Sequence, residues 1–145
     1  MASLYQIRAG IEEVIRSKHP ALAVYRYVPE QTEAPCVILT LDPEKKSAEG
    51  RAFQRGHATY QFQLFVLFNR VSSGVDQEDL DRLIDPADPL SLPNILFNDS
   101  TLGLPDTDCW VEGFKGYGGE FIDSGIPQTG AIICLRVETD PSGGT

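Results

Sequence analysis

The N-terminal part of the chain has a hydrophobic pattern that predicts an amphipathic helix. Its apolar residues recur at intervals of three or four and lie on one face, namely Leu4, Ile7, Ile11, Val14 and Ile15. Ser3 and Gln6 have the spacing of a capping box at the start of this helix. His19 and Pro20 end it, because the residue before a proline avoids helical geometry. We therefore expect a helix over residues 3–18.

Three strand patterns follow this helix. Residues 23–28 alternate and are rich in β-branched and aromatic residues, and residues 36–41 are almost continuously apolar, as in a central strand. Residues 57–68 have a strict period of two, which places Gln61 and Gln63 opposite the large apolar side chains. Those apolar side chains are Tyr60, Phe62, Leu64, Val66 and Phe68.

The next part of the chain predicts a second helix and a short helical turn. The second helix begins near Asp76 and ends before Pro86, and its apolar face consists of Leu80, Leu83 and Ile84. Ser91 has the position of an N-cap for a helical turn over residues 92–98. In this turn we expect three buried side chains, those of Ile95, Leu96 and Phe97.

Two strands are expected near the C-terminus, over residues 109–115 and 129–138, with a glycine-rich bend at residues 116–119 between them. The resulting element order is α-β-β-β-α-(α)-β-β. It indicates an α+β fold with a mainly antiparallel sheet and helices packed on one face. We expect residues 1–139 to form one domain and residues 140–145 to form a flexible tail.

Composition and charge narrow the possible functions. The chain has 145 residues, of which 41% are hydrophobic, and a net charge of −9. It is long enough to bury a core, but it lacks the basic excess with which proteins bind the phosphates of nucleic acids tightly. A protein that DNA slides past without sticking remains possible. No segment has the pattern of a transmembrane helix or a signal peptide, so we expect no contact with a membrane.

The sequence has no pattern typical of a catalytic or metal site, and we expect no enzymatic activity and no cofactor. His19 and His57 lie at the end of a helix and the start of a strand, and no nucleophile elbow surrounds a serine. Asp106 and Asp108 are two residues apart, but Trp110 stands where a third calcium ligand would be needed. The cysteines lack paired spacing and are expected to be small buried side chains, namely Cys36, Cys109 and Cys134.

An acidic run accompanies the second predicted helix. It consists of Asp76, Glu78, Asp79, Asp81, Asp85 and Asp88, and Arg82 interrupts it. Such a run is usually a solvated helix face. The alternative interpretation is a surface that repels phosphate.

Six short segments occur in a characteristic order along the chain. They are PCVIL at residues 35–39, YQFQLFV at 60–66, LDRLIDP at 80–86, SL at 91–92, DSTLG at 99–103 and GAIICLRVET at 130–139. In their order and spacing they resemble the tail terminator (tail completion) proteins of long-tailed bacteriophages. The resemblance covers most of the chain, from about residue 4 to residue 139. The stretch from residue 85 to 93 departs from it, because its prolines shorten the second helix.

The resemblance implies a structural virion protein. Such proteins form a hexameric ring on the finished tail tube, stop its polymerisation and join it to the head–tail connector or neck protein, while DNA passes through the lumen. The implied location is the neck end of the virion tail, after assembly in the host cytoplasm. The acidic run is then a candidate lumen face, which would keep DNA mobile. The alternatives are another phage neck or head-closure component, or an unrelated cellular binding module.

The polar segment at residues 42–56 is longer than a hairpin connection requires, because two to five residues suffice there. It holds one large apolar residue among four cations, and these candidate docking residues are Lys45, Lys46, Arg51, Phe53 and Arg55. We expect it to be a docking arm that contacts a neighbouring subunit or the tail tube. A loop without a partner is the alternative.

Overall fold

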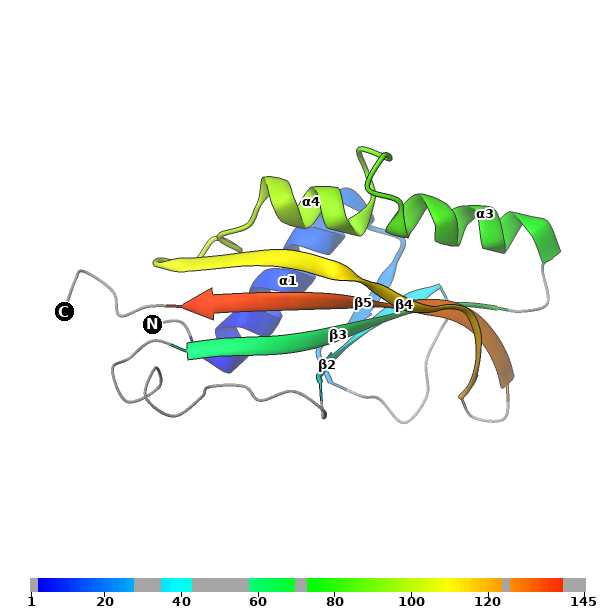
Figure 1. Ribbon diagram of the computed structural model, residues 1–145, viewed down its shortest axis with the longest axis horizontal. Helices are drawn as coiled ribbons and strands as arrows, with labels where there is room; N and C mark the ends of the chain where they lie inside the picture. The colour runs from blue at the N-terminus through cyan, green and yellow to red at the C-terminus, as the bar shows by residue number, and fades with distance from the viewer. Residues whose placement is uncertain (1–2, 28–34, 43–57, 70–72, 124–125, 140–145) are drawn as a thin grey trace.

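The computed structural model describes residues 3–27, 35–42, 58–69, 73–123 and 126–139 (Figure 1). These parts of the chain contain three helices and five strands. The helices are α1 (Leu4–Lys18), α3 (Ser73–Ile84) and α4 (Leu92–Asn98). The strands are β1 (Ala23–Tyr25), β2 (Cys36–Leu41), β3 (Ala58–Asn69), β4 (Thr107–Asp123) and β5 (Ile126–Thr139).

The strands form a single sheet in the order β1-β2-β3-β5-β4. Only the β1–β2 pair is parallel, and the other pairs are antiparallel. The predicted α+β fold, with its mainly antiparallel sheet and its element order, is therefore confirmed. The almost continuously apolar strand β2 lies inside the sheet, as expected, whereas β1 and β4 form its edges (Figure 1).

Helix α1 forms where the capping pattern predicts it. The backbone N–H of Gln6 donates to Ser3 Oγ at 3.1 Å, and the backbone N–H of Ser3 donates to Gln6 Oε1 at 2.8 Å. These reciprocal bonds satisfy two backbone donors that a helix start leaves unpaired. The apolar stripe of the helix is fully buried at Ile7, Ile11 and Ile15.

One hydrophobic core lies between the helices and the inner face of the sheet. Each helix and each of the three central strands contributes to it, through buried residues that include Ile11, Leu80, Leu96, Leu39, Leu64 and Leu135. A second, smaller cluster lies on the opposite face of the sheet and consists of Cys36, Ile38 and Leu67. Because side chains alternate along a strand, this cluster shares its face with Gln61 and Gln63, which are themselves buried.

Helix α1 approaches the loop after α4 very closely at Gly10. A Cβ atom at this position would lie 2.8 Å from the carbonyl oxygen of Leu102. Leu102 itself is buried and has a φ of 54°, a conformation that is uncommon for residues other than glycine. The close approach of Leu102 therefore requires glycine at this position of α1.

Several predicted details are wrong. Helix α3 begins at Ser73 rather than near Asp76, and β1 ends at Tyr25. Phe97 is 74% exposed instead of buried. Each helical residue turns the side-chain direction by about 100°, so that once Ile95 and Leu96 face the core, Phe97 faces outward.

The predicted glycine-rich bend is also wrong, because strand β4 continues through residues 116–119. The glycines instead accompany an irregular register with β5, with shifts between Val111 and Gly113 and between Lys115 and Gly119. Such irregularities place an unpaired residue in one strand and increase its twist. β4 and β5 therefore form one long hairpin instead of two shorter strands.

Candidate functional site

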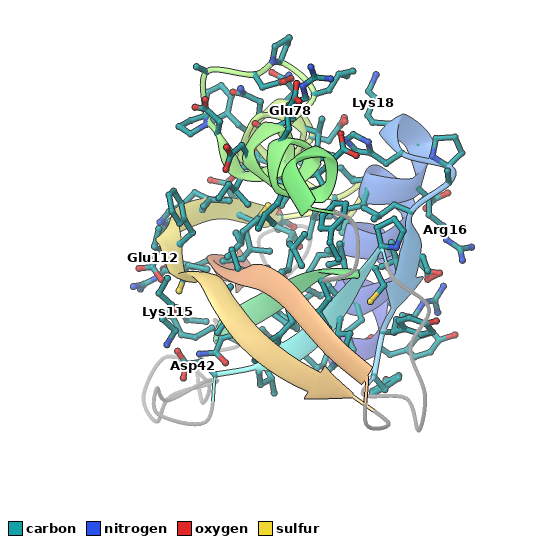
Figure 2. The ribbon with its side chains drawn as sticks, turned by 90° about the vertical axis from the view of Figure 1, so that its right-hand side faces the viewer. Arg16, Lys18, Asp42, Glu78, Glu112 and Lys115 are labelled. Atoms are coloured by element: carbon teal, nitrogen blue, oxygen red, sulfur yellow. The ribbon has the colours of Figure 1, made fainter. Side chains whose placement is uncertain are left out.

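Helix α3 carries three exposed carboxylates that we call the acidic ridge, namely Glu78, Asp79 and Asp81. Figure 2 shows Glu78 on the outer side of this helix. The exposed side chain of Arg82 lies one turn further along and donates to Glu78 Oε1 at 2.8 Å. Asp76 belongs to the same helix, and its side chain lies outside the described ones.

The last two residues of the acidic run have local structural roles. Asp85 Oδ1 accepts a hydrogen bond from the backbone N–H of Ala87 at 2.9 Å, and Asp88 Oδ1 accepts one from that of Leu90 at 2.9 Å. Both bonds span two residues, which is the pattern by which Asp stabilises a turn. The run therefore divides into a surface-forming part on α3 and a turn-forming part after it.

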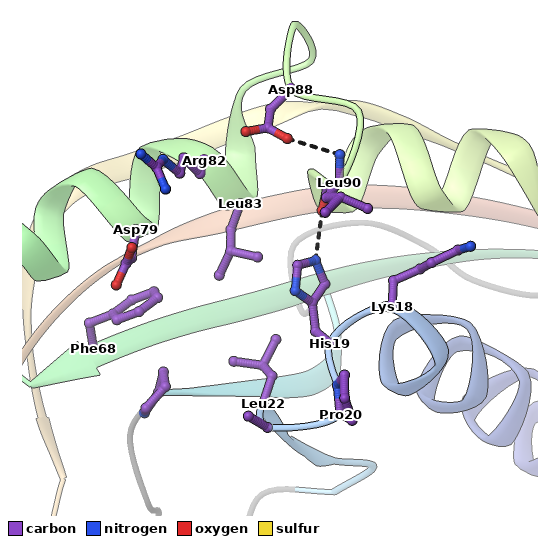
Figure 3. A pocket seen from close by; sticks show the side chains of 12 residues that line it. Lys18, His19, Pro20, Leu22, Phe68, Asp79, Arg82, Leu83, Asp88 and Leu90 are labelled. Carbon is purple, nitrogen blue, oxygen red and sulfur yellow. Dashed lines mark hydrogen bonds between the residues drawn. The ribbon is translucent and has the colours of Figure 1, made fainter.

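A groove of about 500 Å³ lies between the end of α1 and helix α3 (Figure 3). Its lining combines apolar side chains such as Leu22, Phe68 and Leu83 with charged ones at Lys18 and Asp79. The imidazole of His19, at the C-cap of α1, donates from Nε2 to the carbonyl oxygen of Leu90 at 2.6 Å. This bond connects the end of α1 to the loop before α4.

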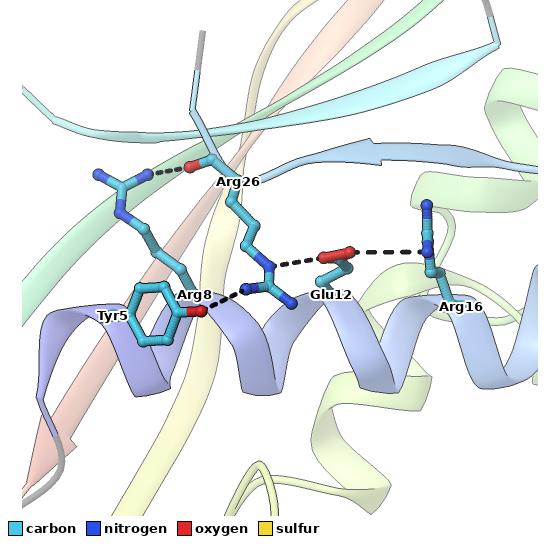
Figure 4. Close-up of polar contacts among 5 residues, drawn as sticks. All are labelled: Tyr5, Arg8, Glu12, Arg16 and Arg26. Carbon is cyan, nitrogen blue, oxygen red and sulfur yellow. Dashed lines mark hydrogen bonds and ion pairs between the residues drawn. The ribbon is translucent and has the colours of Figure 1, made fainter.

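A cluster of cations lies along α1 and the end of β1, on a different side of the molecule from the acidic ridge (Figure 4). Glu12 lies among these cations and binds Arg26 Nε at 2.7 Å and Arg16 Nη1 at 3.7 Å. Arg26 also donates to the Tyr5 hydroxyl at 3.4 Å. The hydrogen bond that Arg26 donates to Glu12 raises the pKa of Arg26.

Arg8 is the buried member of this cluster, with only 8% of its surface exposed. Its Nη1 donates to the carbonyl oxygens of Arg26 and, at 2.9 Å, Leu39. The guanidinium lies 4.5 Å from the ring centre of Tyr27. Within the described residues no carboxylate pairs with Arg8 and its Nε has no hydrogen-bond partner, and burial lowers its pKa.

The acidic ridge was predicted from the sequence, but the basic cluster was missed. Arg8, Glu12 and Arg16 are spaced four residues apart, which places them on one side of a helix. This signal was available in the sequence. Arg26 lies in another element, however, and only the packing of β1 beside α1 brings it to Glu12.

Of the side chains considered in the sequence, His19 lies at the C-cap of α1 and Asp108 on β4. Burial raises the pKa of Cys109 to about 12, so that this cysteine is a thiol rather than a nucleophilic thiolate at neutral pH. Of the candidate docking arm at residues 42–56, only Asp42 is described, and it is buried. The rest of the arm, with Lys45, Lys46, Arg51, Phe53 and Arg55, lies outside the described residues, as does His57. The predicted tail at residues 140–145 lies outside them too.

The described residues hold neither a metal-binding cluster nor a helix suited to span a membrane. They contain no group of three or more His, Cys, Asp or Glu side chains placed to hold a metal ion. None of their helices has both the length and the apolar character needed to cross a membrane. The charged side chains described above form two oppositely charged surfaces, on α3 and along α1.

No protein-family model matches the chain, and no curated protein matches it either.

Proposed function

We propose that this protein is a tail terminator of a long-tailed bacteriophage. Six copies form a ring on the end of the tail tube, stop its polymerisation and provide the joint to the neck or head–tail connector. DNA passes through the lumen of the ring, and the protein has no catalytic role.

The observation that carries this proposal is the position of the segments behind the resemblance. Residues 35–39, 60–66 and 130–139 lie on β2, β3 and β5, which are adjacent in the sheet. Residues 80–86 cover the end of α3, whose Leu80 packs in the same core. These segments thus lie on elements that pack together, which supports a resemblance of the whole fold and not only of separate short segments.

Two surface features are consistent with an assembling subunit. Strand β4 forms a sheet edge over 17 residues, and unpaired edges are common sites for contact with another chain. Several large apolar side chains are exposed, including Trp110 and Phe114 on β4 and Phe97 on α4. Exposed aromatic residues are typical of protein interfaces.

Assembly on tail tubes provides the direct test. We expect native mass spectrometry and electron microscopy of the purified protein, at high concentration or mixed with tail tubes, to show rings of six copies at tube ends. Tubes grown with the protein present should stop at a defined length. A ring of different order that binds connectors and not tubes would instead support another neck or head-closure component. Persistent monomers on tubes would contradict both.

Two finer parts of the proposal have their own tests. If the acidic ridge lines the lumen, changing Glu78, Asp79 and Asp81 to Lys should slow DNA passage without affecting ring formation, because each new cation adds a phosphate contact. If residues 42–56 form a docking arm, replacing them with a four-residue turn should abolish tube capping while the fold survives. Normal tails from either variant would refute that part alone.

A further inference from the structure

Charge is distributed unevenly over this acidic protein. Residues 4–26 contain four cations, Arg8, Arg16, Lys18 and Arg26, and only two carboxylates, Glu12 and Glu13. Helix α3 has the opposite balance, because Arg82 is its single cation beside Asp76 and the acidic ridge. One chain therefore presents both a positive and a negative surface although its net charge is −9.

The positive surface has more charge than its own residues neutralise. Glu12 forms ion pairs with both Arg26 and Arg16, so one carboxylate is shared by two cations. Its contact with Arg16 is the longer one, at 3.7 Å, and the Arg16 side chain is 58% exposed. Arg8 has no carboxylate partner within the described residues, and its buried Nε is unpaired. A desolvated cation without a counter-charge favours an anion at the nearby surface.

Aromatic side chains lie beside these cations. Tyr5 is 62% exposed and stacks at 5.6 Å from the Arg26 guanidinium, and Tyr27 is 56% exposed and lies against Arg8. We call the surface formed by Tyr5, Arg8, Arg16, Arg26 and Tyr27 the basic patch. Exposed Tyr next to Arg is the composition that dominates binding energy in protein interfaces. This composition favours a protein partner over a bare phosphate chain.

The acidic ridge has the complementary excess. Glu78 forms an ion pair with Arg82, but Asp79 is exposed and has no ion pair or hydrogen bond among the described side chains. Figure 2 shows Arg16 at the side of the molecule and Glu78 at its top. Lys18 and Asp79 line the same groove, but Arg16 and Glu78 point in different directions (Figure 2) and can each face another copy.

We propose that the basic patch of one copy binds the acidic ridge of the next copy, and that this head-to-tail contact is the subunit interface of the ring. The inference rests on the proposed function, since two different surfaces on each copy generate a closed ring when the rotation between copies closes. This interface also places the acidic ridge between subunits. In the alternative interpretation, the acidic ridge lines the lumen and faces the DNA.

Two charge reversals with matched controls test this interface. Arg16→Glu lowers the charge of the basic patch by two units, and Asp79→Lys raises that of the acidic ridge by two, so each variant alone should need a concentration about tenfold or more above that of the wild type to form rings. Mixed together, they should form rings again, because half of the contacts in an alternating ring are unaltered and the other half exchange the two charges across the contact. Asp99→Lys and Thr101→Glu, which change the charge of exposed residues in the loop after α4 in the positive and the negative direction, should assemble like the wild type.

The measurement is native mass spectrometry of each protein and of the mixture, with tail tubes as template where the wild type needs them, and circular dichroism to confirm folding. Rings with equal numbers of both variants support the interface. If each variant alone forms rings as readily as the wild type, or if the mixture stays disassembled, the proposed interface is wrong. The proposed function is not affected by either result. Rings that persist while Arg16→Glu loses DNA affinity would show that the patch binds phosphate. If the wild type forms no rings, the proposed function is wrong. If it forms a ring with another even number of copies, and the variants lose and regain that ring in the same way, the proposed interface still holds.

Discussion

The charged residues of the basic patch and those around α3 are held in different ways. In the basic patch, Arg26 of the β1 region binds Glu12 of α1, and Arg8 of α1 binds the carbonyl oxygen of Leu39 on β2. Around α3, Arg82 binds Glu78 on its own helix, and Asp85 binds the backbone two residues ahead. The first region thus depends on contacts between elements, and the second on contacts within them.

Burial follows the same division. The Arg26 and Glu12 side chains are 33% and 13% exposed, whereas those of Arg82 and Glu78 are 66% and 63% exposed. Charge pairs shielded from water interact more strongly than exposed ones, which salt screens. Substitutions of Arg8, Glu12 and Arg26 should therefore change stability, while those on the acidic ridge should change surface properties and leave the fold intact.

Of the substitutions that test this comparison, truncation of Arg8 should lower the free energy of unfolding most. Arg8→Ala removes the hydrogen bonds to the carbonyl oxygens of Arg26 and Leu39 and leaves a void beside Tyr27 and Phe62, which we expect to lower the free energy of unfolding by about 2–4 kcal/mol. Arg8→Met keeps most of the volume and removes a desolvated cation, so its effect should be smaller. Urea denaturation measures both. Equal losses for the two variants would show that the charge matters rather than the packing.

Removing a helix cap should lower stability by an intermediate amount, and the loss should be larger at a buried cap than at an exposed one. Ser91 is fully buried and its hydroxyl accepts from the backbone N–H of Asn94, whereas Ser3 caps α1 at the surface. Ser91→Ala should lower stability by about 1–2 kcal/mol, because the buried N–H loses its partner, and Ser3→Ala by about 0.5–1 kcal/mol, because water replaces the hydroxyl. Thermal unfolding of both variants checks the order, and a greater loss for Ser3→Ala would contradict it.

The ion pairs should give the smallest effects. A double-mutant cycle on Glu78 and Arg82, with Gln at each position, should yield a coupling of about 0.3–0.5 kcal/mol that disappears at high salt. The same cycle on Glu12 and Arg26 should yield a larger coupling that salt reduces less, since both side chains are partly shielded. Chemical denaturation at low and high salt measures both cycles. If the two couplings are equal, the proposed difference between the regions does not extend to pairwise energetics.

Local patterns in the sequence predict those features that depend on neighbouring residues. The capping box and apolar spacing define α1, the Ser91 cap defines α4, and the apolar run and strict alternation identify β2 and β3. The acidic ridge was predicted in the same way, because α3 is amphipathic and its polar face is readable from residue spacing. Helix and strand periods are properties of a few adjacent residues, so the sequence alone determines them.

Only the tertiary structure decided how these elements meet. It placed β1 parallel to β2, carried β4 through its glycines because β5 pairs along its length, and turned Phe97 toward solvent once α4 had docked. It also assembled the basic patch by bringing Arg26 beside Glu12 and burying Arg8. These outcomes depend on contacts between residues far apart in the chain, whose free energies compete across the whole fold and leave no local pattern.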